Sequence, residues 1–207
     1  GTSICGASAI VAADSVVQAE SEESAVSLGV ITLWGTVGIF VLPLLGQALS
    51  MTQFAYGVWA GASLQEMAQV VAGGAAMGDE ASKVATVVKL ARICLLAPVV
   101  FYLVWWMKSK HKSVGEAKVS PVPWFLVVFV VFAALNSLGP SVGLTKPVVD
   151  WLVKVDTLAL SIGMAGVGLK TSVKDLKSAG WKPVVAGLAA WVFITLFSIA
   201  TIKLAGI

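Results

Sequence analysis

The chain has little of what catalytic and metal-binding sites are usually made of. It contains two cysteines, Cys5 and Cys94, and one histidine, His111, among 207 residues. Two isolated cysteines provide neither a disulfide framework nor metal-ligand spacing. His111 lies in a lysine-rich stretch, where a solvated side chain is far more common than a catalytic one. No GxxxxGK[ST] motif occurs, which argues against ATP as a driving force within this chain. Neither a metal ion nor a cofactor is expected.

Charged residues are also scarce. They make up 12% of the chain, whereas hydrophobic residues make up 58%, and an average soluble domain carries about 25% charge. This balance excludes an ordinary water-soluble fold and points to the lipid bilayer as the solvent. The net charge of +3 does not indicate nucleic-acid binding, because the lysines lie in short loops between apolar segments rather than along one face.

The apolar segments predict an all-α, polytopic membrane helix bundle. A spanning helix needs about 20 mainly apolar residues. Five segments reach that length: 25–46, 53–77, 84–107, 122–139 and 183–205. Two shorter segments, 1–19 and 156–170, are rich in Gly, Ser and Thr and predict broken or partial spans. Residues 145–156 are amphipathic, which suits either a helix in the membrane interface or an ordinary connecting helix.

Lysine-rich loops predict the orientation of the chain. Of the 14 Lys and Arg residues, 8 lie in segments 108–120 and 170–182, and such loops are typically cytoplasmic. Counting the predicted crossings then places the acidic segment outside. That segment contains Asp14, Glu20, Glu22 and Glu23.

The first of three polar clusters lies at the start of the chain. Residues 1–8 read GTSICGAS and combine two glycines with four hydroxyl or thiol groups. Glycine permits unwound backbone, and hydroxyl groups can satisfy amides that lose their helical partners. A half-helix beginning near Gly6 would present free N–H groups and the positive end of its dipole at membrane depth. The alternative is tight helix packing through small residues.

The second cluster lies within segment 53–77. Gln65 and Gln69 share one helix face, and Glu66 lies beside it. An ionisable residue with apolar sequence on either side is a functional candidate. The alternatives for its carboxyl are pairing with Lys83, Lys89 or Arg92, or protonation.

The third cluster contains Gly163, Gly166 and Gly168. Each glycine costs a continuous helix about 1 kcal/mol relative to alanine, so a kink or break is predicted. Two glycine-interrupted short segments, 1–19 and 156–170, fit an inverted-repeat transporter with its site at the midplane.

Five blocks of sequence, in order along the chain, resemble the YeiH-type family of bacterial inner-membrane proteins, which are commonly labelled sulfate exporters. The blocks are GTSICGASAI, WAGASLQEMAQVVAGG, ATVVKLARICLLAP, PWFLVVFVVFAALNSL and MAGVGLKTSVKDLKSAGWKP. Family members often have His where this chain has Gln65, so a proton relay through an imidazole does not carry over.

The resemblance implies the architecture of bile-acid symporters and sodium/proton antiporters, with two inverted five-helix repeats and two crossed broken helices. Residues 1–52 would end the first repeat, which would lack about three helices at the start of the chain. Residues 53–207 would form the second. Segments 1–13 and 156–170 would be the broken helices.

Together these observations predict a secondary transporter of a small anion, sulfate or an organic sulfonate, that works by alternating access and is not an enzyme. A passive channel or structural subunit is the alternative, followed by an intramembrane enzyme with Cys5 or Ser8 as nucleophile. Glu66 is the predicted coupling or gating residue. The predicted substrate-binding residues are Thr2, Ser3, Gly6, Ser8, Gln65, Gln69, Gly166 and Gly168. The expected partners are lipid, the anion, H⁺ or Na⁺ as coupling ion, and a second copy of the chain in a homo-oligomer.

Overall fold

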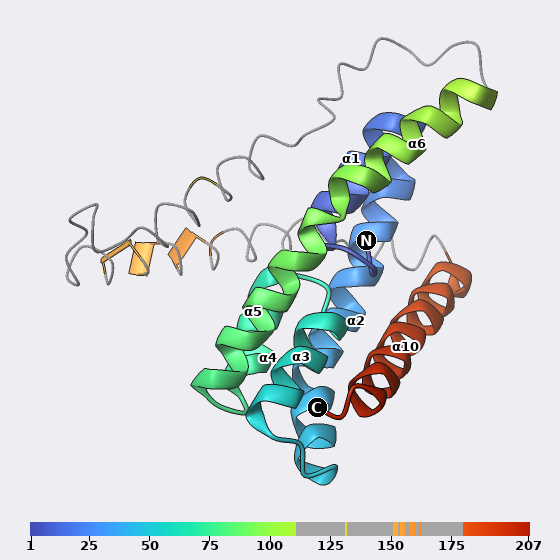
Figure 1. Cartoon of the computed structure of the whole chain (residues 1–207). Helices are drawn as coiled ribbons and strands as arrows, with labels where there is room; N and C mark the ends of the chain where they lie inside the picture. The colour runs from blue at the N-terminus through green and yellow to red at the C-terminus, as the bar shows by residue number, and fades with distance from the viewer. Residues whose placement is uncertain (111–130, 132–150, 153, 156–157, 160–161, 163–179) are drawn as a thin grey trace.

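The structure is a computed structural model that describes residues 1–110, 131, 151–152, 154–155, 158–159, 162 and 180–207. Within these residues all regular structure is helical, as the sequence predicts (Figure 1). The helices are α1 (Ala7–Val17), α2 (Ser21–Ala48), α3 (Gln53–Ser63), α4 (Met67–Ala75), α5 (Asp79–Cys94), α6 (Leu96–Lys110) and α10 (Trp181–Leu204).

Three stretches are long and apolar enough to cross a membrane: Ser21–Ala48, Asp79–Met107 and Trp181–Leu204. They confirm the spans predicted at 25–46, 84–107 and 183–205. Asp79–Met107 consists of α5 followed directly by α6. The predicted span 122–139 and most of the predicted break 156–170 lie outside the described residues. In the amphipathic stretch 145–156, the four described residues are helical and exposed.

The prediction of a continuous span at 53–77 is wrong, because this segment is a re-entrant hairpin. Gly57 and Gly61 of α3 pack against the carbonyls of Ala81 and Ala85 of α5, so these two helices run in the same direction. Helix α4 returns, and Gly78 after it lies against the side chain of Gln53 at the start of α3. With 11 and 9 residues, α3 and α4 are about 16 and 14 Å long, roughly half of a hydrocarbon core of about 30 Å.

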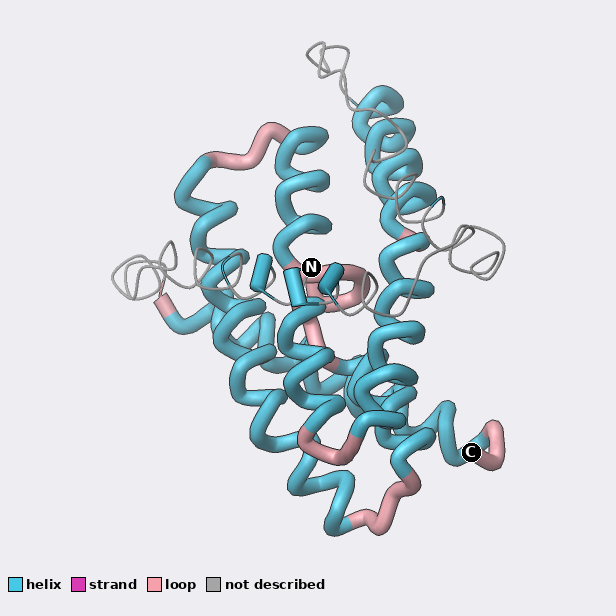
Figure 2. The backbone as a smooth tube through the Cα atoms, turned by 90° about the vertical axis from the view of Figure 1, so that its left-hand side faces the viewer, coloured by secondary structure: helices cyan, strands magenta, loops and turns pink. Residues whose placement is uncertain are grey.

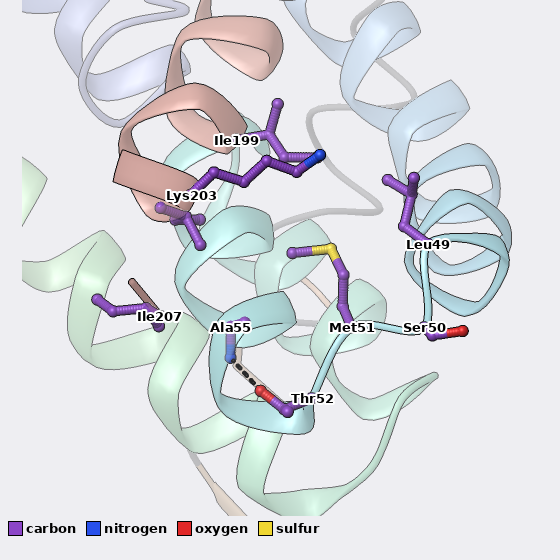
Figure 3. Close-up of a pocket in the computed structure, with 9 residues that line it drawn as sticks. Leu49, Ser50, Met51, Thr52, Ala55, Ile199, Lys203 and Ile207 are labelled. Atoms are coloured by element: carbon purple, nitrogen blue, oxygen red, sulfur yellow. Dashed lines mark hydrogen bonds between the residues drawn. The ribbon is translucent and has the colours of Figure 1, made fainter. Parts of the chain in front are cut away.

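Helices α2 and α10 are parallel neighbours. The first turns of α10 lie beside the middle of α2, where Gly187 packs on Val30 and the Trp34 indole N–H donates to the Val184 carbonyl at 2.9 Å. At their other ends, a cavity of about 240 Å³ is lined from both sides, with Leu49 following α2 and Lys203 closing α10 (Figure 3). The same cavity borders Thr52, whose hydroxyl accepts a hydrogen bond from the Ala55 N–H at 3.1 Å and so caps the start of α3.

These directions correct the predicted orientation. Because residues 53–77 enter and leave at one face, only two crossings separate the acidic segment 14–23 from the end of α6. The start of α2 therefore lies at the same end of the bundle as the end of α6, whereas α10 runs in the same sense as α2 but begins at about the height of the N-terminus (Figure 1). Lys and Arg set the orientation, whereas Asp and Glu contribute little. If the lysine-rich loops are cytoplasmic, the acidic segment lies on that side too.

The core lies between the hairpin and the long helices. Its buried residues come from α2, α3, α4, α5 and α10 and include Leu42, Tyr56, Trp59, Leu64 and Trp191. The Trp59 indole N–H donates to the Thr195 carbonyl at 3.0 Å, which ties α10 to α3. A second cluster packs α1 and the loop before it against α6. This arrangement holds the start of α1 at mid-height in the bundle, where Figure 2 shows the chain's first residues.

Candidate functional site

Two short helices begin at mid-height and run in opposite directions. Helix α1 begins at Ala7 after the cap residue Gly6, and α4 begins at Met67 after the cap residue Glu66. Helix α1 runs to the end of the bundle where α6 ends, whereas α4 runs to the opposite end (Figure 1). The first N–H groups of a helix lack internal partners and carry about half a positive charge. Two such positive ends therefore meet inside the bundle, and we call this place the junction.

The carboxylate of Glu66 occupies the junction. Its Oε1 accepts a hydrogen bond of 2.7 Å from the N–H of Ala7, the first residue of α1. The same side chain accepts from the backbone N–H of Gln69 in the first turn of α4. In return, the Gln69 side-chain oxygen accepts from the Glu66 N–H at 3.0 Å, which completes a capping box. One carboxylate thus caps two helices, and its hydrogen bonds go to backbone N–H groups rather than to the lysines or arginine considered from the sequence.

Gly6 makes this contact possible. Its φ of +74° lies in the left-handed region, and a Cβ atom there would collide with the Glu66 carboxyl group. Gly35 of α2 has the same role for Gln69, because a Cβ atom at Gly35 would collide with the amide of that side chain. Both positions require close backbone approach, which only glycine permits.

Two cations on α5 hold the loops on either side of the junction. Lys89 is fully buried, and its Nζ donates to the Leu64 carbonyl at 2.8 Å. Arg92 donates to the carbonyls of Gly61 at 2.9 Å and Leu64 at 3.1 Å, at the end of α3. It also donates to the carbonyls of Thr2 at 2.6 Å and Ser3 at 3.2 Å. The guanidinium therefore joins the two breaks, and both cations lie at the negative end of the α3 dipole.

Buried polar atoms without a partner adjoin the junction. Gln65 is fully buried, yet within the described chain neither its amide nitrogen nor its amide oxygen has a hydrogen-bond partner. The hydroxyl of the buried Ser63 is likewise unpaired there. Such groups are uncommon in folded proteins and often mark a site for water or a ligand. The break between α3 and α4 thus carries spare donors and acceptors.

The structure brings together four of the predicted site residues: Gly6, Gln65, Glu66 and Gln69. Thr2 and Ser3 contribute their carbonyls to Arg92, whereas the side chains of Ser3 and Ser8 are exposed. The remaining predicted residues, Gly166 and Gly168, and also His111, lie outside the described residues. In the described part of the chain, no three His, Cys, Asp or Glu side chains gather in a way that could hold a metal ion.

From the sequence, Lys89 and Arg92 were expected only as partners for Glu66 and not as residues of the site. Their position inside a predicted apolar span was the available signal, since ionisable residues in spans usually face a bundle interior.

The sequence also contains a repeat at a spacing of 60 residues, which relates the two breaks to each other. Residues 1–13 and 61–73 match at four positions, and the cap residues Gly6 and Glu66 occupy equivalent places. The matched residues are Gly1 and Gly61, Ser3 and Ser63, Val11 and Val71, and Ala12 and Ala72.

The comparisons with known proteins agree on one family. The profile of the family described as "Conserved hypothetical protein 698" matches residues 1–187. The UPF0324 inner membrane protein YeiH of Salmonella typhi is 38% identical over 199 residues, which cover 94% of this chain and 56% of that protein. A UPF0324 membrane protein of Pseudomonas aeruginosa is 38% identical over 205 residues, which cover 94% of this chain and 57% of that protein. YeiH of Escherichia coli K12 is 37% identical over 201 residues, with coverages of 94% and 56%.

The chain therefore spans little more than half the length of these relatives. No solved structure matches it. The names of the relatives agree with the three membrane-length helices, and the resemblance predicted from the sequence is confirmed. The chain belongs to the UPF0324 family, described as Conserved hypothetical protein 698, and is a bacterial inner-membrane protein.

Proposed function

We propose that this chain forms part of a secondary transporter for a small anion, which binds at the junction of α1 and α4 and crosses by alternating access. Sulfate and organic sulfonates are the first substrates to test. The observation that carries the proposal is the meeting of two helix N-termini at mid-height around a carboxylate. Backbone N–H groups at helix starts are well suited to binding oxyanions.

The direction of the elements supports the proposal. Helices α1 and α2 begin 60 residues before α4 and the α5–α6 span, within two residues, and run in the opposite sense. We propose that these two units are inverted repeats related by an axis in the membrane plane. Transporters built this way place their substrate at the midplane, where discontinuous helices point their N-termini at anionic groups. This pairing differs from that of segments 1–19 and 156–170 expected from the sequence.

The junction also has the balance of charges that an anion carrier needs. Lys89 and Arg92 bring two positive charges to the two breaks, and Glu66 brings one negative charge. The cations are bonded to carbonyls rather than to the carboxylate, so they favour a negative group nearby without filling the place where it would bind. A site without a direct Lys or Arg ligand releases its anion readily, as a carrier requires.

Flux measurements on the complete protein in proteoliposomes test this function. The test anions are sulfate, methanesulfonate, phosphate, nitrate, chloride and acetate. A carrier gives saturable flux that is accelerated by the same anion on the opposite side. Ohmic current would instead indicate a channel, conversion of a test compound an enzyme, and absence of flux for all six anions would refute the proposal.

A further inference from the structure

We infer that the Glu66 carboxylate and the transported anion compete for the same place at the junction, so that an anion binds only after Glu66 has accepted a proton. This inference rests on the proposed function and adds the coupling ion to it. In a transport cycle, one proton then moves in the same direction as each anion.

The hydrogen bonds of Glu66 carry the inference. Its carboxylate accepts from the N–H of Ala7 at 2.7 Å and from the N–H of Gln69. These are the donors that an oxyanion at the start of α1 or α4 would use. As long as the Glu66 carboxylate accepts these hydrogen bonds, it occupies the anion-binding site itself.

The surroundings of Glu66 favour exchange over simple addition. The charged and titratable groups near it are Lys89 from α5, with Arg92 beside it, and Cys5 from the segment before α1. Lys89 makes one hydrogen bond, to Leu64, among the described residues. Adding a second anion beside the Glu66 carboxylate would bring two like charges together in a poorly solvated place. Replacing the carboxylate charge with that of a monoanion leaves the buried charge unchanged and avoids that cost, and replacing it with sulfate adds one negative charge instead of two.

The proton balance of the exchange is simple. A hydronium ion gives its proton to a carboxylate oxygen of Glu66 and becomes water. The neutral carboxyl group is a weaker acceptor than the carboxylate, so it yields the N–H groups of Ala7 and Gln69 to the anion. On the other side of the membrane, the anion leaves and the proton returns to water. The carboxylate then accepts the hydrogen bonds of the Ala7 and Gln69 N–H groups again.

The test uses the complete protein and the same six anions. For each anion that the wild type binds, we expect uptake of one proton per anion bound, measured in weakly buffered detergent solution at a pH where Glu66 is mostly ionised. The apparent Kd should rise about tenfold per pH unit once Glu66 is mostly ionised, because only the protonated fraction can bind the anion. Glu66→Gln should keep anion exchange in proteoliposomes, lose the pH dependence and move no protons. Glu80→Gln removes an exposed carboxyl from α5 and should behave as wild type.

The outcomes separate the two ideas. If the wild type carries an anion but takes up no proton on binding, or if Glu66→Gln keeps the wild-type pH profile, Glu66 is not displaced, although the transporter function stands. If the wild type carries none of the six anions, the proposed function fails. Should Glu66→Gln be lost to misfolding, as size-exclusion chromatography would reveal, the proton count on the wild type decides alone.

Discussion

Gly6 and Glu66 lie 60 residues apart in the sequence, and the side chain of the second fills the space that a side chain on the first would need. The two cap residues are complementary: one has no side chain, and the other supplies a carboxylate for both helices. This relationship makes Gly6 the most direct position at which to disturb the junction without removing a charge.

We expect Gly6→Ala to lower the stability of the protein and to reduce anion flux. Gly180→Ala is the matched control, because Gly180 has a similar φ, +78° against +74°, but no atom of the described residues within 4 Å of the added Cβ. Both substitutions place alanine in a sparsely populated positive-φ conformation, at a cost of the order of 1–3 kcal/mol, and only Gly6→Ala also displaces Glu66. Thermal unfolding and flux should therefore separate the two variants, and equal behaviour would contradict the described contact.

The re-entrant hairpin predicts a specific cross-link. A Cβ atom at Gly78 would lie 2.5 Å from the Gln53 side-chain oxygen, so cysteines at these two positions should be joined by a short bifunctional reagent. If residues 53–77 crossed the membrane as one helix, the same positions would be about 35 Å apart, beyond the reach of such a reagent. Cysteines at Gln53 and Ser21, at opposite ends of the bundle, serve as the negative control.

The corrected orientation predicts which positions can be labelled from each side. In a Cys94→Ser background, Ser21→Cys and Lys182→Cys should react with an impermeant thiol reagent from the same side, and Ser50→Cys only from the other. The lysine-rich loops identify the shared side as cytoplasmic. Labelling of Ser21→Cys and Lys182→Cys from opposite sides would contradict the parallel arrangement of α2 and α10.

We expect Lys89→Met to reduce anion flux without destabilising the fold. A buried ammonium with one hydrogen bond is costly, and an apolar replacement of similar size is often neutral or stabilising. The midpoint of thermal unfolding should therefore hold or rise. Flux should fall about tenfold, equivalent to roughly 1.4 kcal/mol of binding, because a cation near the junction is lost.

Lys83→Met on the same helix is the control for Lys89→Met, because Lys83 is exposed. It should leave both flux and stability as in the wild type. A Lys89→Met variant with wild-type flux would show that this lysine only supports the hairpin through Leu64.

The long helices could be predicted from the sequence because length and apolar content are enough to recognise a span, as α2 and α10 illustrate. The hairpin at 53–77 could not be predicted this way. Twenty-five mainly apolar residues fit one crossing or two half-length helices equally well, and the difference depends on three residues outside the helices, Leu64, Gln65 and Glu66. Their conformation is fixed by contacts from elsewhere in the chain, such as those of Arg92 and Ala7.

The candidate site could also be predicted only in part. Glu66, Gln65 and Gln69 were identified because burying polar groups at membrane depth costs free energy, so such groups usually mark a functional site. The segment that contacts them was not identified, because composition does not tell which glycine-rich break lies against them. The first break, ending at Gly6, meets Glu66 through a backbone N–H, and such a contact leaves no trace in the type of side chain at Ala7.

The short length of α3 and α4 also bears on how the protein is made. Segments of 11 and 9 residues are too short to be inserted across the bilayer by their own hydrophobicity, and their open ends expose backbone groups that lipid cannot satisfy. We expect the hairpin to enter the membrane only after its neighbours, α2 and the α5–α6 span, have provided a protein surface that accepts it. The junction would then be among the last features to form during biogenesis, when most of the bundle is already in place.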